Sequence, residues 1–263
     1  MDFEYKKKFG QNFISDTNLL KSILNNAEIK KEDEILEIGT GLGSLTKILS
    51  EYTKHVVSLE IDNSLKEYLK DVELLSNVKI IFGDCMRMDE KELAKEFNSF
   101  KIVANLPYYI TTPIIFKFLP VKNLTEMVLM VQKEVAERIC SKPNCKDYGV
   151  LSANIQVNCS VKIIKNVPAS MFYPRPNVDS AVIQIIKNPL KLVPENYQET
   201  VRMAFLHRRK TLYNNMILAG FTKENAVYLL NKMNLPLNIR GETLSPDDFL
   251  NLANLINEAN LIS

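Results

Sequence analysis

The feature that most constrains the fold is a glycine-rich run between a strand-like and a helix-like segment. Residues 34–38, Glu-Ile-Leu-Glu-Ile, have the composition of a strand, and residues 45–49 have the apolar spacing of a helix face. Residues 39–43 between them read Gly-Thr-Gly-Leu-Gly. Glycines at such a turn let the backbone approach a ligand closely, and the N–H groups at a helix start attract polar groups. The run predicts a strand–turn–helix unit whose turn is either a binding loop or a tightly packed corner.

The first two-thirds of the chain alternates between strand-like and helix-like patterns. Strands separated by helices of about ten residues form βαβ units and a mostly parallel sheet. Residues 160–166 and 179–187 are separated by a proline-rich stretch with no room for a helix, so these two strands should pair antiparallel. We therefore predict an α/β, Rossmann-like sheet with an antiparallel terminal hairpin. The other predicted strands are residues 55–60, 78–82, 101–104 and 127–131, and the predicted helices are residues 19–24, 45–49, 65–74, 93–97, 133–140 and 150–158.

The last third of the chain shows only helical periodicity. From Glu195 onward, apolar residues recur at helical spacing, and Asn188-Pro189 through Pro194 forms a natural boundary. We predict one domain over residues 1–190, which contains the glycine run, and a small all-helical domain over residues 191–263.

The composition excludes several classes of protein. The chain has 263 residues, 46% of them hydrophobic and 24% charged, which suits a globular protein and excludes a disordered or collagen-like one. No uncharged apolar run approaches the ~18–20 residues of a membrane span, and the N-terminus lacks the apolar core of a signal peptide. The four cysteines form no CxxC pair, so we expect no metal site. These features predict a cytoplasmic protein without a membrane partner.

The net charge of +2 does not by itself indicate a nucleic-acid partner. Any such evidence must lie in local clusters, and two are present, Lys6-Lys7-Lys8 and His207-Arg208-Arg209-Lys210. Each cluster, taken alone, could also be a solvated face.

The spacing of the glycines distinguishes between two cofactor-binding patterns. A nicotinamide fingerprint beginning at Gly39 would need a third glycine at position 44, where the chain has Ser44. The spacing E-x-G-x-G-x-G, which begins at Glu37, is instead typical of methyltransferases that use S-adenosylmethionine (AdoMet). Glu60 closes the second strand 21 residues after Gly39, where a carboxylate can accept both ribose hydroxyls. Asp84, after the third strand, could bond the adenine amino group, although either carboxylate could also simply face solvent.

The residues Asn105-Leu106-Pro107-Tyr108 carry the strongest chemical signal. They resemble the (D/N)-P-P-Y motif of enzymes that methylate exocyclic amines of nucleic-acid bases. An aryl amine is a poor nucleophile because its lone pair is delocalised into the ring. The Asn105 side-chain oxygen and the Leu106 carbonyl can accept both N–H groups and draw the nitrogen toward tetrahedral geometry. Pro107 stiffens the turn, and Tyr108 offers a ring on which the base can stack.

With these motifs together, the chain resembles the ribosomal-RNA adenine N6-dimethyltransferase family, which modifies two adjacent adenosines near the 3′ end of small-subunit rRNA. The match runs almost end to end and departs from the family's usual residues at Thr40 and Ile14. The segments that carry it are Lys8–Phe13, Leu36–Gly39, Asn105–Ile110, Val131–Arg138, Phe172–Val182 and Arg208–Leu212.

The resemblance implies that residues 1–190 form an AdoMet-dependent methyltransferase domain and that residues 191–263 form a helical rRNA-binding domain. It also implies roles for individual residues. Phe172 would oppose Tyr108 and complete an aromatic clamp for the base. Arg208, Arg209 and Lys210, expected on a basic helix, would contact the RNA backbone. The other aromatic residues, Tyr109 among them, are expected in the core. The residues that would line the AdoMet site are Asn12, Ile14, Gly39, Gly41, Glu60, Asp84 and Asn105.

Three alternatives differ from this interpretation in function. An erythromycin-resistance type methylase of large-subunit rRNA shares the AdoMet and Asn-x-Pro-Tyr motifs, but the Arg208–Thr211 run favours the small-subunit enzyme. A non-catalytic assembly factor could keep the fold, although the intact motifs favour retained catalysis. A dehydrogenase is disfavoured because Ser44 stands where the nicotinamide fingerprint needs its third glycine. The resemblance implies an assembling small subunit as partner, a role in ribosome maturation, AdoMet as cofactor and a monomeric enzyme.

Overall fold

The computed structural model describes residues 12–188 and 192–259, which divide into two compact units. The first unit comprises residues up to Ala136 together with Val161–Lys187, and the second comprises Glu137–Ser160 with the chain from Asn188 onward. The Lys6–Lys8 cluster, the first residues of the Lys8–Phe13 motif and residues 189–191 of the predicted boundary lie outside the described residues.

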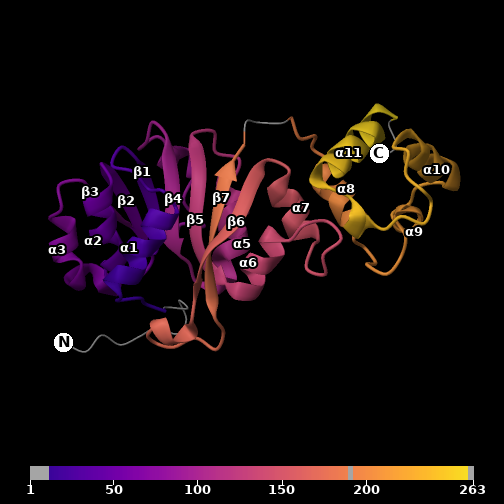
Figure 1. Cartoon of the computed structure of the whole chain (residues 1–263). Helices are drawn as coiled ribbons and strands as arrows, with labels where there is room; N and C mark the ends of the chain where they lie inside the picture. The colour runs from indigo at the N-terminus through magenta and orange to yellow at the C-terminus, as the bar shows by residue number, and fades with distance from the viewer. Residues whose placement is uncertain (1–11, 189–191, 260–263) are drawn as a thin grey trace. The chain divides into compact units, whose positions relative to one another are not determined.

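A seven-stranded sheet forms the centre of the first unit, with strand order β3-β2-β1-β4-β5-β7-β6 (Figure 1). The first five strands are parallel, whereas β7 runs antiparallel to β5. The predicted Rossmann-like sheet with a terminal antiparallel hairpin is therefore confirmed. The strands are β1 (Glu34–Ile38), β2 (His55–Glu60), β3 (Val78–Phe82), β4 (Phe100–Asn105), β5 (Leu124–Gln132), β6 (Cys159–Val167) and β7 (Ser180–Lys187).

Two helices of the first unit, α1 and α4, begin at an aspartate that caps them. The Asp16 carboxylate accepts a hydrogen bond from the Leu19 N–H at 3.0 Å, which starts α1. The helix predicted over residues 65–74 is instead a 3₁₀ turn followed by the short α3, and Leu65, Leu69 and Val72 still bury one apolar face there. The helices are α1 (Thr17–Asn26), α2 (Ser44–Tyr52), α3 (Lys70–Glu73), α4 (Glu90–Ala94), α5 (Thr111–Phe118) and α6 (Lys133–Cys140), whose second half belongs to the second unit.

The second unit is helical and larger than the sequence predicts. It contains α7 (Val150–Gln156) in addition to the C-terminal helices, because residues 148–157 share their hydrophobic core. The buried Tyr148 hydroxyl donates to the Leu244 carbonyl at 2.9 Å, and the Tyr197 hydroxyl donates to the Ala153 carbonyl at 2.9 Å. The C-terminal helices are α8 (Tyr197–Ala204), α9 (Leu212–Leu218), α10 (Lys223–Lys232) and α11 (Pro246–Glu258).

Candidate active site

A cavity of the first unit lies where β1, β2 and β4 end. In a parallel sheet this edge is where ligands bind, because the loops that follow the strands meet there. Nearly all the predicted cofactor and catalytic residues line this cavity. They are Asn12, Ile14, Gly39, Gly41, Glu60, Asn105, Leu106, Pro107 and Tyr108.

The glycine loop needs its glycines for two separate reasons. All three have positive φ angles, +89° at Gly39, +57° at Gly41 and +79° at Gly43, which side chains of L-residues rarely adopt. A Cβ at Gly41 would also lie 2.7 Å from the ring of Phe13, which lines the cavity. The glycines therefore allow close packing of the loop, and its role as a binding loop stays a prediction.

Glu60 connects the end of β2 to the glycine loop. Its side chain is buried, and its two carboxylate oxygens accept the N–H groups of Gly41 and Asp62, each at 2.8 Å. Burial raises the pKa of this carboxyl, and the two hydrogen bonds oppose that shift. Because a carboxylate offers about four acceptor positions, Glu60 can still accept hydroxyl groups from a ligand in the cavity.

Beneath the loop lies a buried carboxyl that the sequence analysis did not single out. Glu37 is 0% exposed, and its Oε2 accepts the hydroxyls of Thr46 and Ser58, each at 2.6 Å. Its Oε1 is buried and has no hydrogen-bond partner within residues 12–188 and 192–259. Burial raises the Glu37 pKa to about 8, so this side chain is mostly protonated at neutral pH. The signal for this network in the sequence was the position of Glu37 at the start of the E-x-G-x-G-x-G spacing.

Asn105 ends β4, and its side chain is held by one hydrogen bond. Its Nδ2 donates to the backbone carbonyl of Asn12 at 2.8 Å. One of the two N–H groups of the amide is therefore used, and no described residue donates to Oδ1. The Leu106 side chain is apolar and buried, so Leu106 can contribute only backbone groups at this turn, its carbonyl among them.

The turn after Asn105 holds the Tyr108 ring against the same cavity. Pro107 leads into a 3₁₀ turn at Tyr108–Ile110, closed by a hydrogen bond from Ile110 N to the Pro107 carbonyl at 3.1 Å. The Tyr108 hydroxyl lies 2.8 Å from the hydroxyl of Ser180, at the start of β7. Burial raises the pKa of Tyr108, which keeps the phenol neutral.

Asp84 lies in a second recess that shares Gly39, Ile61 and Pro107 with the main cavity. Its carboxylate accepts the Met86 N–H at 2.9 Å, so it is positioned by its own loop. Tyr109 lines the same recess and is 65% exposed. The expectation that Tyr109 belongs to the core is wrong, because the 3₁₀ turn directs it away from the sheet.

Phe172 is the predicted catalytic residue that the structure does not bring to the cavity. It is 4% exposed and packs in the main hydrophobic core of the first unit with Leu20 and Val182. The next residue, Tyr173, forms a two-way backbone bridge with Phe13, whose N–H and carbonyl each bond at 2.9 Å. The aromatic clamp thus remains a prediction for Phe172, and Phe13 is a cavity residue for which only the motif Lys8–Phe13 gave a signal.

The basic run of the second unit lies in a turn between α8 and α9. A basic helix was expected here, and that expectation is wrong because α8 ends at Ala204 and Thr211 caps α9, its hydroxyl accepting the Asn214 N–H at 3.2 Å. Arg208 forms an ion pair with Glu242, with 3.2 Å between Nε and Oε2. Arg209 and Lys210 are exposed.

Two features are absent from the described residues. Among them, no group of His, Cys, Asp and Glu side chains could hold a metal ion. No helix in the described part of the chain is long and apolar enough to cross a membrane.

Comparison with known proteins gives consistent matches. The family model for ribosomal RNA adenine dimethylase matches residues 2–258. The ribosomal RNA small subunit methyltransferase A of Caldanaerobacter subterraneus is 46% identical over 95% of this chain and 97% of its own length. The protein of the same name from Streptococcus thermophilus is 43% identical over 98% of this chain and 94% of its own length.

Two solved structures share the fold over both units. A dimethyladenosine transferase from Plasmodium falciparum has a TM-score of 0.83 and 28% identity, covering 95% of this chain and 98% of its own. The 23S rRNA methyltransferase ErmE has a TM-score of 0.71 and 22% identity, covering 94% of this chain and 100% of its own. The likeness to ErmE shows the fold alone, whereas the sequence relatives carry the small-subunit name.

Proposed function

This chain belongs to the ribosomal RNA adenine dimethylase family, and from that premise we propose that it transfers methyl groups from AdoMet to the N6 atoms of two adjacent adenosines near the 3′ end of small-subunit rRNA. The methyltransferase activity is that of the family. The proposal adds the cofactor, the paired target bases and the residues that act on them. The observation that supports it is the hydrogen bond from Asn105 to Asn12, which fixes the side chain of a cavity residue and leaves its oxygen without a donor among the described residues.

The residues at the edge of the sheet fit AdoMet, which when bound supplies a methyl group on a positively charged sulfur. The backbone at Gly39 and Gly41 would lie against it, and Glu60 would accept its ribose hydroxyls. The buried Glu37 Oε1, without a partner among the described residues, leaves one more acceptor or donor beneath this loop. Asp84, in the adjoining recess, would bond an adenine amino group.

The turn that follows β4 would prepare the target amine. Asn105 Oδ1 and the Leu106 carbonyl would accept its two N–H groups, which localises the nitrogen lone pair and directs it away from both acceptors. The Tyr108 ring would stack on the base, and its bond to Ser180 fixes the ring's position. Because these groups orient the amine without removing a proton from it beforehand, no strong base is required.

The substrate and setting follow from the same proposal. The RNA would be part of an assembling small subunit in the cytoplasm, and its phosphates would contact exposed cations of the second unit, Arg209 and Lys210 in particular. A single chain contains the whole proposed site, so a monomer suffices.

Primer extension on small ribosomal subunits that lack the modification tests the proposal. After incubation with the protein and AdoMet, extension should stop at two adjacent adenosines near the 3′ end, because dimethyladenosine blocks it. The Asn105→Ala variant and a reaction without AdoMet serve as controls. Read-through with the wild-type protein, together with methylation of large-subunit rRNA, would assign the chain to the sister activity instead.

A further inference from the structure

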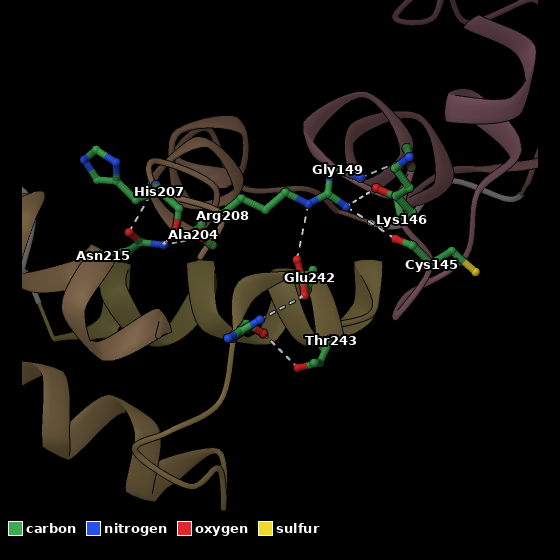
Figure 2. A network of polar contacts seen from close by, with 11 residues as sticks. Cys145, Lys146, Gly149, Ala204, His207, Arg208, Asn215, Glu242 and Thr243 are labelled. Carbon is green, nitrogen blue, oxygen red and sulfur yellow. Dashed lines mark hydrogen bonds and ion pairs between the residues drawn. The ribbon is translucent and has the colours of Figure 1, made fainter. Parts of the chain in front are cut away.

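Arg208 is bound to its own protein on two sides, although it belongs to the basic run. Its Nε lies 3.2 Å from Glu242 Oε2, while its Nη2 donates to the backbone carbonyls of Lys146 and, at 3.4 Å, Cys145 (Figure 2). The guanidinium thus joins the turn after α8 to two other segments, residues 144–146 and 240–243. Both segments and the turn belong to the second unit.

The two segments that Arg208 joins also contact each other. The Asn144 N–H donates to the Glu242 carbonyl at 2.9 Å. Gly241 lies so close to the end of α8 that a Cβ there would be 2.5 Å from the Ala204 carbonyl oxygen. Arg208 therefore lies where three parts of the chain meet.

Asn215 of α9 holds the start of the same turn. Its side chain is 0% exposed, and Nδ2 donates to the Ala204 carbonyl at 2.7 Å and to the His207 carbonyl at 3.3 Å, while Oδ1 accepts the His207 N–H at 3.2 Å (Figure 2). The Lys210 N–H then closes the turn onto the His207 carbonyl at 2.9 Å. The turn is fixed at Asn215 and at Arg208.

Arg209 and Lys210, by contrast, have no ion pair or side-chain hydrogen bond with any residue that the structure describes. We propose that Arg208 is a positioning residue rather than a phosphate contact, and that it holds the turn so that Arg209 and Lys210 present their charges to RNA. This inference rests on the proposed RNA substrate. It reduces the expected phosphate contacts of the run from three to two.

The chemistry of the side chain separates the two roles. A guanidinium has five donors in a planar fork and can bond a carboxylate and two carbonyls at once, whereas a lysine ammonium is a point charge. Arg208→Lys keeps the charge that a phosphate would need but loses the fork that the anchor needs. If Arg208 anchors the turn, this substitution should behave like Arg208→Gln.

The experiment combines two measurements on the full chain, the salt dependence of binding to unmodified small ribosomal subunits and the hydrogen exchange of residues 142–149. Arg208→Lys, Arg208→Gln and Glu242→Gln should each raise the exchange rate several-fold and weaken binding about three- to tenfold without changing the log–log salt slope. Arg209→Gln and Lys210→Gln should each lower the slope by about one and leave the exchange unchanged.

Two outcomes would contradict parts of this inference and distinguish it from the proposed function. If Arg208→Lys matches the wild type while Arg208→Gln lowers the salt slope by about one, Arg208 is a phosphate contact and the positioning role is wrong. If Arg209→Gln and Lys210→Gln change neither binding nor slope, the turn is not an RNA surface, even where the exchange data establish the anchor. Glu242→Gln keeps the test available should the Arg208 variants fail to fold.

Discussion

The side-chain amide of Asn105 donates from Nδ2 to the backbone carbonyl of Asn12, 2.8 Å away and 93 positions earlier in the chain. This bond uses one of the two N–H groups and fixes the orientation of the amide. The Asn105 oxygen receives no hydrogen bond from a described residue, and an exocyclic amine needs acceptors for its two N–H groups. The geometry therefore favours an acceptor role for Asn105.

Asn105→Ala should reduce methyl transfer far more than it reduces binding. Removing a group oriented toward a changing charge distribution costs about 10²–10³ in rate. Asn105→Asp keeps an acceptor but places a carboxylate against the Asn12 carbonyl, so it should also lose activity. The measurement is single-turnover methylation of unmodified small subunits, with mono- and dimethyladenosine resolved by mass spectrometry.

Asn77→Ala is the matched control for this prediction. Asn77 also donates from Nδ2 to backbone carbonyls, those of Ser50 and Thr53 at 2.9 and 3.0 Å, but it does not line the cavity. Its loss should lower stability and leave the single-turnover rate near that of the wild type. Equal rates for wild type and Asn105→Ala would show that the residues after β4 have no role in methyl transfer.

Glu60→Ala should weaken AdoMet binding at least about a hundredfold. Two hydrogen bonds from ribose hydroxyls to a charged acceptor would be lost, each contributing about 1.5–3 kcal/mol. The loss also removes the acceptor of the Gly41 and Asp62 N–H groups, so Glu60→Gln should lie between the wild type and the alanine variant. Calorimetric titration with AdoMet measures the affinities directly.

Glu34→Gln provides the comparison for Glu60. Glu34 is also a buried carboxylate on a neighbouring strand, and it accepts the Asn98 N–H at 2.8 Å, but it lies at the start of β1 rather than at the ligand-binding edge. The Glu34→Gln variant should bind AdoMet with the affinity of the wild type. An unchanged affinity in Glu60→Ala would remove Glu60 from the cofactor site.

The sequence predicts the sheet and the glycine loop well because both depend on local patterns. Strand β3 and helix α6 have the predicted bounds, and Asp16 caps α1 as its position before the apolar face suggests. Glycines with positive φ in a strand–helix turn are likewise determined by the residues themselves. Nine residues predicted for the site accordingly meet at one cavity.

The differences arise where distant residues decide the structure. The sequence around Arg208 predicts an unpaired cation, because its ion-pair partner Glu242 lies 34 positions later in the chain. Tyr148 joins the helical unit through a bond to Leu244, 96 positions away, which no spacing pattern indicates. Phe172 lies in a motif associated with base binding, yet it is buried in a core cluster whose residues come from many elements, α1 and β7 among them.

Glu37 should make the stability of the protein depend on pH. Its pKa is about 8 in the folded state against 4.5 as the ordinary value, so the folded protein binds more protons between these limits. The stabilising contribution is fully present below about pH 4.5 and is lost as the pH rises through about 8, by up to about 1.4 kcal/mol per pH unit in this window. Glu37→Gln should remove this dependence.

Urea denaturation of both proteins without AdoMet, at pH 6 and pH 8.5, measures the effect. The wild type should lose more free energy of unfolding than Glu37→Gln between the two pH values, and the difference isolates this carboxyl from other titrating groups. Parallel pH profiles would mean that Glu37 is ionised in the folded protein.

Two substitutions distinguish a packing role of Phe172 from a role in holding the base. Because its side chain is buried in the core, Phe172→Ala should lower the free energy of unfolding by about 3–5 kcal/mol. Phe172→Leu keeps much of the volume and should fold, yet it lacks a ring on which a base could stack.

If packing is the whole role, Phe172→Leu gives wild-type single-turnover rates and a wild-type ratio of mono- to dimethyladenosine. If Phe172 turns toward the base during the reaction, stacking worth about 1–3 kcal/mol is lost. Monomethyladenosine then accumulates in the folded Phe172→Leu protein. The burial in this structure favours the first result, and accumulation of monomethyladenosine with unchanged AdoMet affinity would establish the second.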